Sequence, residues 1–231
     1  MSMFSFKQFS VCQDRSAMKV GTDGVLLGAW ASGGNSILDV GTGTGLIALM
    51  MSQRFPQAQV TAIDIDDQAV AEALQNVESS PFSQRITVCC SSLQQFAVMH
   101  NHSSFDSIVC NPPFFEETLH CPDAARNVAR HTEALPFSDL TDCCAALLSE
   151  RGTLNLIIPV SALGRVEEQC AYSSLFLSEK LFVRTVQRKQ PKRVMLRMVK
   201  HPVPCVINEQ VLMEDGCRSQ WYAQITNDFY L

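Results

Sequence analysis

The sequence predicts an α/β protein with one mostly parallel sheet of seven strands, the last antiparallel, and helices on both faces. Three observations lead to this fold class. Short apolar runs alternate with longer amphipathic runs along residues 37–172, as in strand–helix–strand units. The first apolar run is followed by a glycine-rich turn, residues 41–45. The last two runs, 175–186 and 193–199, alternate in hydrophobicity across a polar turn, which predicts a hairpin.

Size and composition favour one domain. The chain has 231 residues, of which 46% are hydrophobic and 18% charged, values typical of a globular protein. We predict one domain, residues 1–231, with an N-terminal arm at 1–30 and a basic C-terminal hairpin at 175–200. The amino terminus has no apolar run long enough for a signal peptide or a membrane span. We therefore expect a cytoplasmic protein, monomeric and without membrane contact.

The ten cysteines do not predict a metal site. No C-x-x-C spacing occurs, and the adjacent pair Cys89-Cys90 would point to opposite faces of a strand. His100 and His102 have no partners at ligand spacing. We expect buried free thiols and no bound metal.

The elements follow in order. Residues 3–22 predict an extended arm with alternating apolar residues, and Thr22 or Asp23 should cap a helix at 24–30. Strands are expected at 37–40, 59–63, 85–90, 105–110, 153–158, 175–186 and 193–199. Helices are expected at 46–51, 68–77 (capped by Asp66, with Val70, Ala73, Leu74 and Val77 on one side), 93–99, 137–148 (ending at Arg151-Gly152) and 161–172. Residues 115–135 form a long polar insertion, and 221–231 a short helix or strand of no assigned role.

The glycine turn indicates a nucleotide ligand. Strand, glycine turn and helix open a nucleotide-binding unit, and Asp64 lies 23 positions after Gly41, near the distance at which such folds place an acid on a ribose. The pattern is G-x-G-x-G, with Leu46 where a dinucleotide fingerprint has its third glycine, so a pyrophosphate is not indicated. Asp39 would suit an ammonium group. These residues predict an adenosine bearing an amino acid tail, unless both acids are ordinary loop or cap carboxylates.

A second candidate site follows the strand at 105–110. Asn111-Pro112-Pro113-Phe114 stands at a strand's carboxyl end, where ligands bind in open α/β sheets. The Asn amide oxygen and a backbone carbonyl at Pro112 can both accept from an amino group, and Phe114 offers a stacking face. This arrangement predicts a socket for the exocyclic amine of a base. The alternative is a plain type I turn, for which Asn followed by Pro is common chemistry.

Charge is concentrated in the C-terminal hairpin. The net charge is -5, yet eight basic residues and no acidic ones lie at 180–200, which leaves -13 for the remainder. We expect such a chain to bind a polyanion only at this hairpin and to repel it elsewhere. If strand 175–186 runs parallel to strand 105–110, its turn, with Arg188, Lys189 and Lys192, emerges beside the Asn111 site. The alternative is a solvated hairpin.

Taken together, Asp39-x-Gly41-x-Gly43-x-Gly45, Asp64 and Asn111-Pro112-Pro113-Phe114 resemble the class I S-adenosylmethionine-dependent N-methyltransferases, which have a Rossmann-like sheet. The segments at 6–9, 14–15 and 18–30 are similar to those of bacterial tRNA (adenine-N6) methyltransferases. The resemblance implies methylation of the adenosine 3′ of the anticodon in valine tRNA. It implies cofactor contacts from Gly21, Asp39, Gly41, Gly43, Gly45, Asp64, Ser92 and Asn111, and a catalytic role for Asn111, Pro112 and Phe114. Substrate contacts are expected from Phe115, Arg130, His131, Arg188, Lys189 and Lys192.

Two positions depart from the pattern. Ser92 stands where an Asp usually holds the cofactor's adenine, and Phe114 where many relatives have Tyr. Because of these two departures, the motif does not by itself identify the substrate. A guanine-N2 or a glutamine-N5 methyltransferase would use the same four residues, and a non-catalytic RNA-binding module is the remaining alternative.

Overall fold

The computed structural model describes residues 2–16, 19–100, 104–112 and 135–231. The strands are β1 (Met3–Ser5), β2 (Ser10–Cys12), β3 (Ser36–Val40), β4 (Gln59–Asp64), β5 (Ile86–Cys90), β6 (Phe105–Cys110), β7 (Leu148–Pro159), β8 (Phe176–Val186), β9 (Arg193–Val199), β10 (Val206–Glu214) and β11 (Cys217–Arg218). The helices are α1 (Thr22–Trp30), α2 (Leu46–Arg54), α3 (Asp67–Glu78), α4 (Leu93–Met99), α6 (Phe137–Leu147), α7 (Leu163–Tyr172) and α8 (Gln220–Thr226), with short 3-10 turns at Ser83–Arg85 and Val160–Ala162.

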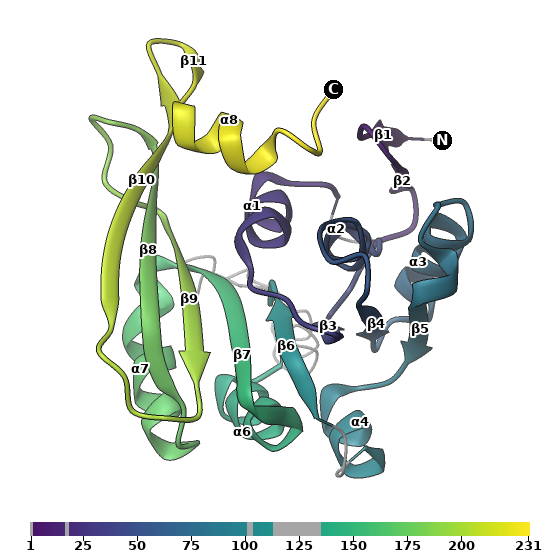
Figure 1. Ribbon diagram of the computed structural model, residues 1–231, viewed down its shortest axis with the longest axis horizontal. Coiled ribbons are helices and arrows are strands. Elements are labelled where there is room, and N and C mark those ends of the chain that lie inside the picture. Colours follow the sequence, from purple (N-terminus) through teal and green to yellow (C-terminus); the bar gives the residue numbers. More distant parts are fainter. Residues whose placement is uncertain (1, 17–18, 101–103, 113–134) are drawn as a thin grey trace, which may run out of the picture.

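One sheet runs through the molecule in the order β11-β10-β8-β9-β7-β6-β3-β4-β5 (Figure 1). Strands β5, β4, β3, β6 and β7 are parallel, and β9 runs antiparallel between β7 and β8. The α/β prediction is confirmed, with all seven expected strands present. The count of seven was wrong for the whole sheet, because β10 pairs parallel to β8 and carries β11. Its residues Val206 and Ile207 are 54% and 63% exposed, so no clear buried face marked this strand in the sequence.

Helices cover both faces of the sheet, as predicted. Helices α1, α2, α3 and α8 lie on one face, and α4, α6 and α7 on the other (Figure 1). Alternate strand residues enter the two cores. Ile37 and Val109 join the core under α1 and α2, whereas Leu38 and Ile108 join the core under α6 and α7. Burial on both faces explains the continuous apolar runs of these strands.

Two helix boundaries differ from the prediction. Gly21, not Thr22 or Asp23, is the residue before α1, and it makes no side-chain cap bond. The Asp23 carboxylate instead accepts from Arg193 Nε at 2.7 Å. Gly152 lies inside β7 rather than after a helix, where the β6–β7 register shifts. A Cβ there would stand 2.6 Å from the Phe105 carbonyl oxygen, so glycine permits the close strand approach.

Helix α3 is capped as predicted, since the Asp66 side chain accepts from Gln68 N at 2.9 Å. Three of the four residues predicted for one side of the helix, Val70, Ala73 and Val77, are buried as expected. Leu74 is 39% exposed, whereas Glu72 and Asn76 are each 2% exposed. These two polar side chains make hydrogen bonds to the N-terminal arm. Those bonds offset the cost of burying polar groups, so the buried face of the helix includes residues that its apolar pattern did not indicate.

The nine cysteines within the described ranges are free thiols, but Cys90, Cys205 and Cys217 are exposed, contrary to the expected burial. All three lie at or next to the sheet's two ends. Within the same ranges, no three His, Cys, Asp or Glu side chains are placed to hold a metal ion. None of the described helices is long and apolar enough to cross a bilayer.

Candidate active site

Three neighbouring strands end in step at the carboxyl edge of the sheet. Val40 is paired with Cys110 on β6 and with Ile63 on β4. The next residues, Gly41, Asn111 and Asp64, therefore form one row, with adjacent strands ~4.8 Å apart. The chain passes from β3 to β4 on one side and returns to β6 on the other, so this row flanks the point where strand order reverses. Ligands bind at such points in open α/β sheets.

The glycine turn is open on its outer side. Gly41, Gly43 and Gly45 have φ values of 68°, 56° and 81°, in the left-handed region that favours glycine. The turn is held from below, because the backbone N–H groups of Gly41 and Thr42 both donate to the Ile63 carbonyl, at 2.9 and 3.0 Å. A Cβ added at Gly41 or Gly43 would meet nothing within 4 Å. These glycines leave room for a ligand against the backbone.

Asp39 is fully buried beneath this turn. One carboxylate oxygen, Oδ2, accepts from Thr42 Oγ1 at 2.6 Å and from Ala48 N at 3.1 Å. The other, Oδ1, is buried and has no hydrogen-bond partner among the described residues. Burial raises the pKa of Asp39 to about 7, the hydrogen bonds from Thr42 and Ala48 lower it, and the nearby Asp64 raises it. A buried carboxylate oxygen in need of a partner fits a cationic group, as the amino acid tail of the predicted ligand requires.

Asp64 is tied to the glycine turn. Its carboxylate accepts from Gly43 N at 2.8 Å and from Asp66 N at 3.0 Å, one bond on each oxygen. A carboxylate has about four acceptor positions, so two remain for ribose hydroxyls. Ser92 lies close by along the chain, since the preceding Ser91 N–H donates to the Asp64 carbonyl at 2.9 Å. The Ser92 hydroxyl caps α4 by accepting from Gln95 N at 3.2 Å, and its contact with an adenine stays a prediction.

The start of α1 packs beside the glycine turn. A Cβ at Gly24 would stand 3.1 Å from Leu46, the residue that follows the turn. Gly21 is the residue that precedes α1. Its cofactor contact stays a prediction.

Sequence reasoning missed the polar residues that fix the arm. The Glu72 carboxylate accepts from the backbone N–H groups of Asp14, Arg15 and Ser16, at 2.6, 2.9 and 2.8 Å. Burial raises the pKa of Glu72, but these hydrogen bonds outweigh burial and hold that pKa below its ordinary value. The signal in the sequence was two polar residues, Glu72 and Asn76, spaced four apart on a helix and therefore on one side of it.

Asn111 is half-buried and Pro112 is buried, directly after β6. Phe114, Phe115, Arg130 and His131 lie outside the described residues, so their predicted roles stay predictions. The structure does bring together Asp39, the glycine turn, Asp64 and Asn111, which are far apart in the sequence.

The basic hairpin reaches the same edge of the sheet. Strand β8 runs parallel to β6, because each of the β7–β9 and β9–β8 pairings reverses direction. Five of its eight cations are in ion pairs: Lys180 with Glu167, Arg184 with Glu209, Arg193 with Asp23, Arg197 with Glu179, and Lys200 with Glu150. The other three, Arg188, Lys189 and Lys192, are exposed in the turn and have no acidic partner within the described ranges. They form what we call the basic turn.

Comparison with known proteins agrees with this geometry. The family described as methyltransferase small domain matches residues 19–135. The chain is 42% identical to the tRNA1(Val) (adenine(37)-N6)-methyltransferase of Bacteroides thetaiotaomicron and 44% identical to that of Phocaeicola vulgatus, in each case over 99% of this chain and 97% of the relative. In fold, it is similar to a predicted O-methyltransferase from Agrobacterium tumefaciens, with a TM-score of 0.69 at 17% identity over 90% of this chain and 96% of that one. The chain therefore belongs to the methyltransferase small domain family and is an S-adenosylmethionine-dependent methyltransferase.

Proposed function

We propose that the protein methylates N6 of the adenosine 3′ of the anticodon in a valine tRNA. The observation that carries this proposal is the row formed by Gly41, Asn111 and Asp64. This row follows adjacent strands, so a cofactor at the glycine turn and an amine at Asn111 would be close enough to meet in line. The names of the relatives above, which are similar over nearly their full length, support the same substrate.

S-adenosylmethionine, when bound, supplies a methyl group on a positively charged sulfur. The backbone of the glycine turn would contact the cofactor. Asp39 would pair with the cofactor's ammonium group, and Asp64 would accept hydrogen bonds from its ribose hydroxyls. Burial of Asp39 and the open space in front of Gly41 and Gly43 fit this assignment.

The residues after β6 would orient the target. An adenine amine is a weak nucleophile because its lone pair is shared with the ring. Acceptance of its hydrogens by the Asn111 side chain and the Pro112 carbonyl favours a pyramidal nitrogen aimed at the methyl group. The nitrogen lone pair would form a bond to the methyl carbon as the carbon–sulfur bond breaks, which leaves a neutral thioether, and the methylated nitrogen would then lose one proton to solvent. Positioning of this kind can contribute ~7–11 kcal/mol.

The base has to leave its stack before it enters the socket. The free-energy cost of unstacking is small for an unpaired loop nucleotide, and an anticodon loop contains such nucleotides. The basic turn would contact phosphates on either side of the target base.

We propose that the whole chain acts as one methyltransferase domain, since a single sheet connects β5 to β11. A monomer in the cytoplasm stays a prediction from the sequence.

The test is product analysis. Purified protein is incubated with unmodified valine tRNA and S-adenosylmethionine labelled in its methyl group, and the digested nucleosides are separated. We expect label in N6-methyladenosine from the anticodon loop. Label in N2-methylguanosine, or label that survives ribonuclease but not protease, would replace this proposal with one of the two alternative substrates.

A further inference from the structure

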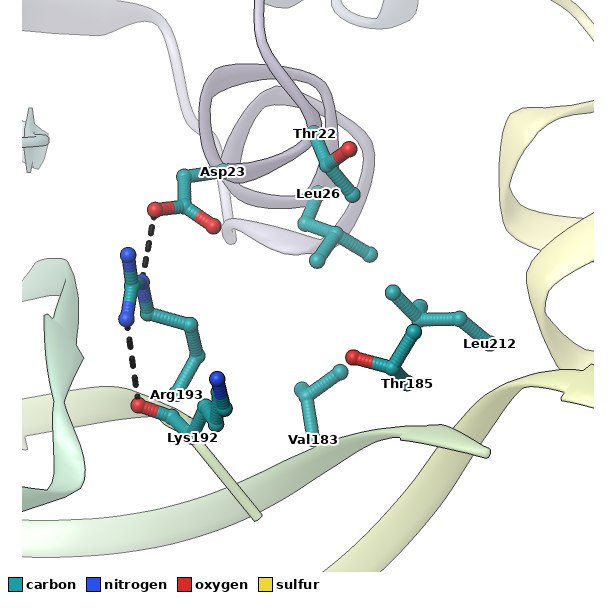
Figure 2. Close-up of a pocket in the computed structure, with 8 residues that line it drawn as sticks. All are labelled: Thr22, Asp23, Leu26, Val183, Thr185, Lys192, Arg193 and Leu212. Atoms are coloured by element: carbon teal, nitrogen blue, oxygen red, sulfur yellow. Dashed lines mark hydrogen bonds and ion pairs between the residues drawn. The ribbon is translucent and has the colours of Figure 1, made fainter. Parts of the chain in front are cut away.

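A cavity of about 220 Å³ opens between α1 and strands β8–β10 (Figure 2). Thr22 and Asp23 line it from α1, and Thr185, Lys192 and Arg193 line it from the hairpin. Its apolar lining is formed by Leu26, Val183 and Leu212. The site described above does not include this cavity, although Lys192 belongs to both the cavity and the basic turn.

The cavity lies within reach of the amine socket. Arg193 is paired with Pro159 on β7, and the residue opposite Asn111 in register is Ile157, two positions earlier. Arg193 is thus two strands across and two residues along from Asn111, which corresponds to about 12 Å. That distance is three to four stacked nucleotides at ~3.4 Å each. An RNA with its target base at Asn111 would therefore have a nucleotide three to four positions away at this cavity.

Charge at the rim favours a phosphate. Lys192 and Arg193 carry two positive charges against the single carboxylate of Asp23. The Asp23–Arg193 pair is half-open, with 32% and 36% of the two side chains exposed. The Lys192 ammonium has no hydrogen-bond partner in the parts of the chain that the structure describes. An exposed lysine beside a guanidinium is common phosphate-binding chemistry.

The interior favours a base. Asp23 Oδ2 accepts from Arg193, and a carboxylate that keeps further acceptor positions can receive the amino group of a cytosine. The hydroxyls of Thr22 and Thr185 can donate or accept. Figure 2 shows these side chains around one open space, with Leu26 above it, Val183 below it and Leu212 at its right side, so a planar ring between Leu26 and Val183 would meet apolar carbon.

We propose that this cavity binds one unpaired anticodon-loop nucleotide of the tRNA, three to four positions from the target adenosine, with its phosphate on Lys192 and Arg193 and its base against Leu26, Val183 and Leu212. The proposal rests on the tRNA substrate proposed above. It assigns the cavity to recognition of the loop, separate from the methyl transfer itself.

The experiment fills the cavity from an exposed position. Thr185→Trp places a large ring in the space, and Thr185→Ser, which keeps the hydroxyl, is its matched control. We expect Thr185→Trp to raise the Kd for tRNA about tenfold, with the Kd for S-adenosylmethionine within about twofold of wild type. Thr185→Ser should keep the wild-type Kd for tRNA. A melting curve checks that each variant is folded, and Leu212→Phe replaces Thr185→Trp if the latter is not.

A second arm separates binding in the cavity from indirect effects. Valine tRNAs with a single abasic nucleotide are tested at each anticodon-loop position other than the target. One of these positions should weaken wild-type binding about tenfold and have no further effect on Thr185→Trp, because the two changes remove the same contact. Equal tRNA affinity of Thr185→Trp and wild type, or additive effects at every abasic position, would overturn the cavity proposal. Methylation of the intact tRNA tests the proposed function independently.

Discussion

The side-chain amide of Asn76 joins the N-terminal arm to the cofactor turn. Its Nδ2 donates to the Thr44 carbonyl and to the Cys12 carbonyl, both at 2.9 Å, while its Oδ1 accepts from Cys12 N at 2.8 Å. Together with Glu72, it ties β2 and the segment at 14–16 to α3. The arm is therefore part of the structure that shapes the glycine turn.

Asn76→Ala should weaken cofactor binding more than turnover. The change leaves the buried Thr44 carbonyl and the part-buried backbone groups of Cys12 without these partners, at a cost of about 1–3 kcal/mol for the buried group. We expect a Kd for S-adenosylmethionine about tenfold higher by calorimetry, with kcat at saturating cofactor largely kept. Glu78→Ala, on the exposed side of the same helix, is the control. Equal effects of both variants would mean that the loss comes from helix stability, not from the link to Thr44.

Asn111→Ala should do the opposite. If the Asn111 amide oxygen accepts from the reacting nitrogen, its loss affects the transition state and not the cofactor. We expect kcat to fall by at least about 100-fold, with the calorimetric Kd for S-adenosylmethionine within a fewfold of wild type. Asn208→Ala, on the exposed part of β10, should leave both constants unchanged. Comparable losses in kcat and cofactor affinity for Asn111→Ala would show a structural role instead.

Asp39 should make cofactor binding depend on pH. Burial raises the pKa of Asp39 to about 7, so below that pH the side chain is largely neutral and attracts a cationic ligand weakly. Binding of the ammonium group favours the ionised form, so affinity should rise with pH up to about 7 and then level off. Well below the pKa the change approaches about tenfold per pH unit. Calorimetry from pH 5.5 to 8.5 measures it, and Asp39→Asn should bind weakly with no such slope. A wild-type curve that is flat through pH 7 would refute the role of Asp39.

Neutralising the basic turn should weaken tRNA binding without changing its sequence preference. Replacing Arg188, Lys189 and Lys192 with Gln removes three charges that have no acidic partner in the described structure. The slope of log K against log salt should flatten by about 2–3. The control neutralises Lys180 and Lys200, which face Glu167 and Glu150, and should change that slope less. An unchanged slope in the triple variant would place the RNA elsewhere.

The sequence by itself determined the order of the elements and the chemistry of the site. Apolar runs of 4–6 residues located β3, β4 and β6 because parallel strands are buried on both faces. The glycine spacing located the turn because positive φ values need glycine. Asp39, Asp64 and Asn111 could be singled out because each is a polar residue at, or within one position of, the carboxyl end of such a run.

Only the tertiary structure decided which of these residues meet and which charges are available. The in-step ending of β3, β4 and β6 depends on sheet register, which no local pattern encodes. Likewise, eight clustered cations could be read from the chain, but their pairing could not. Glu167, Glu209 and Asp23 approach them from other elements of the fold, and long-range contacts of this kind arise only when the whole chain packs.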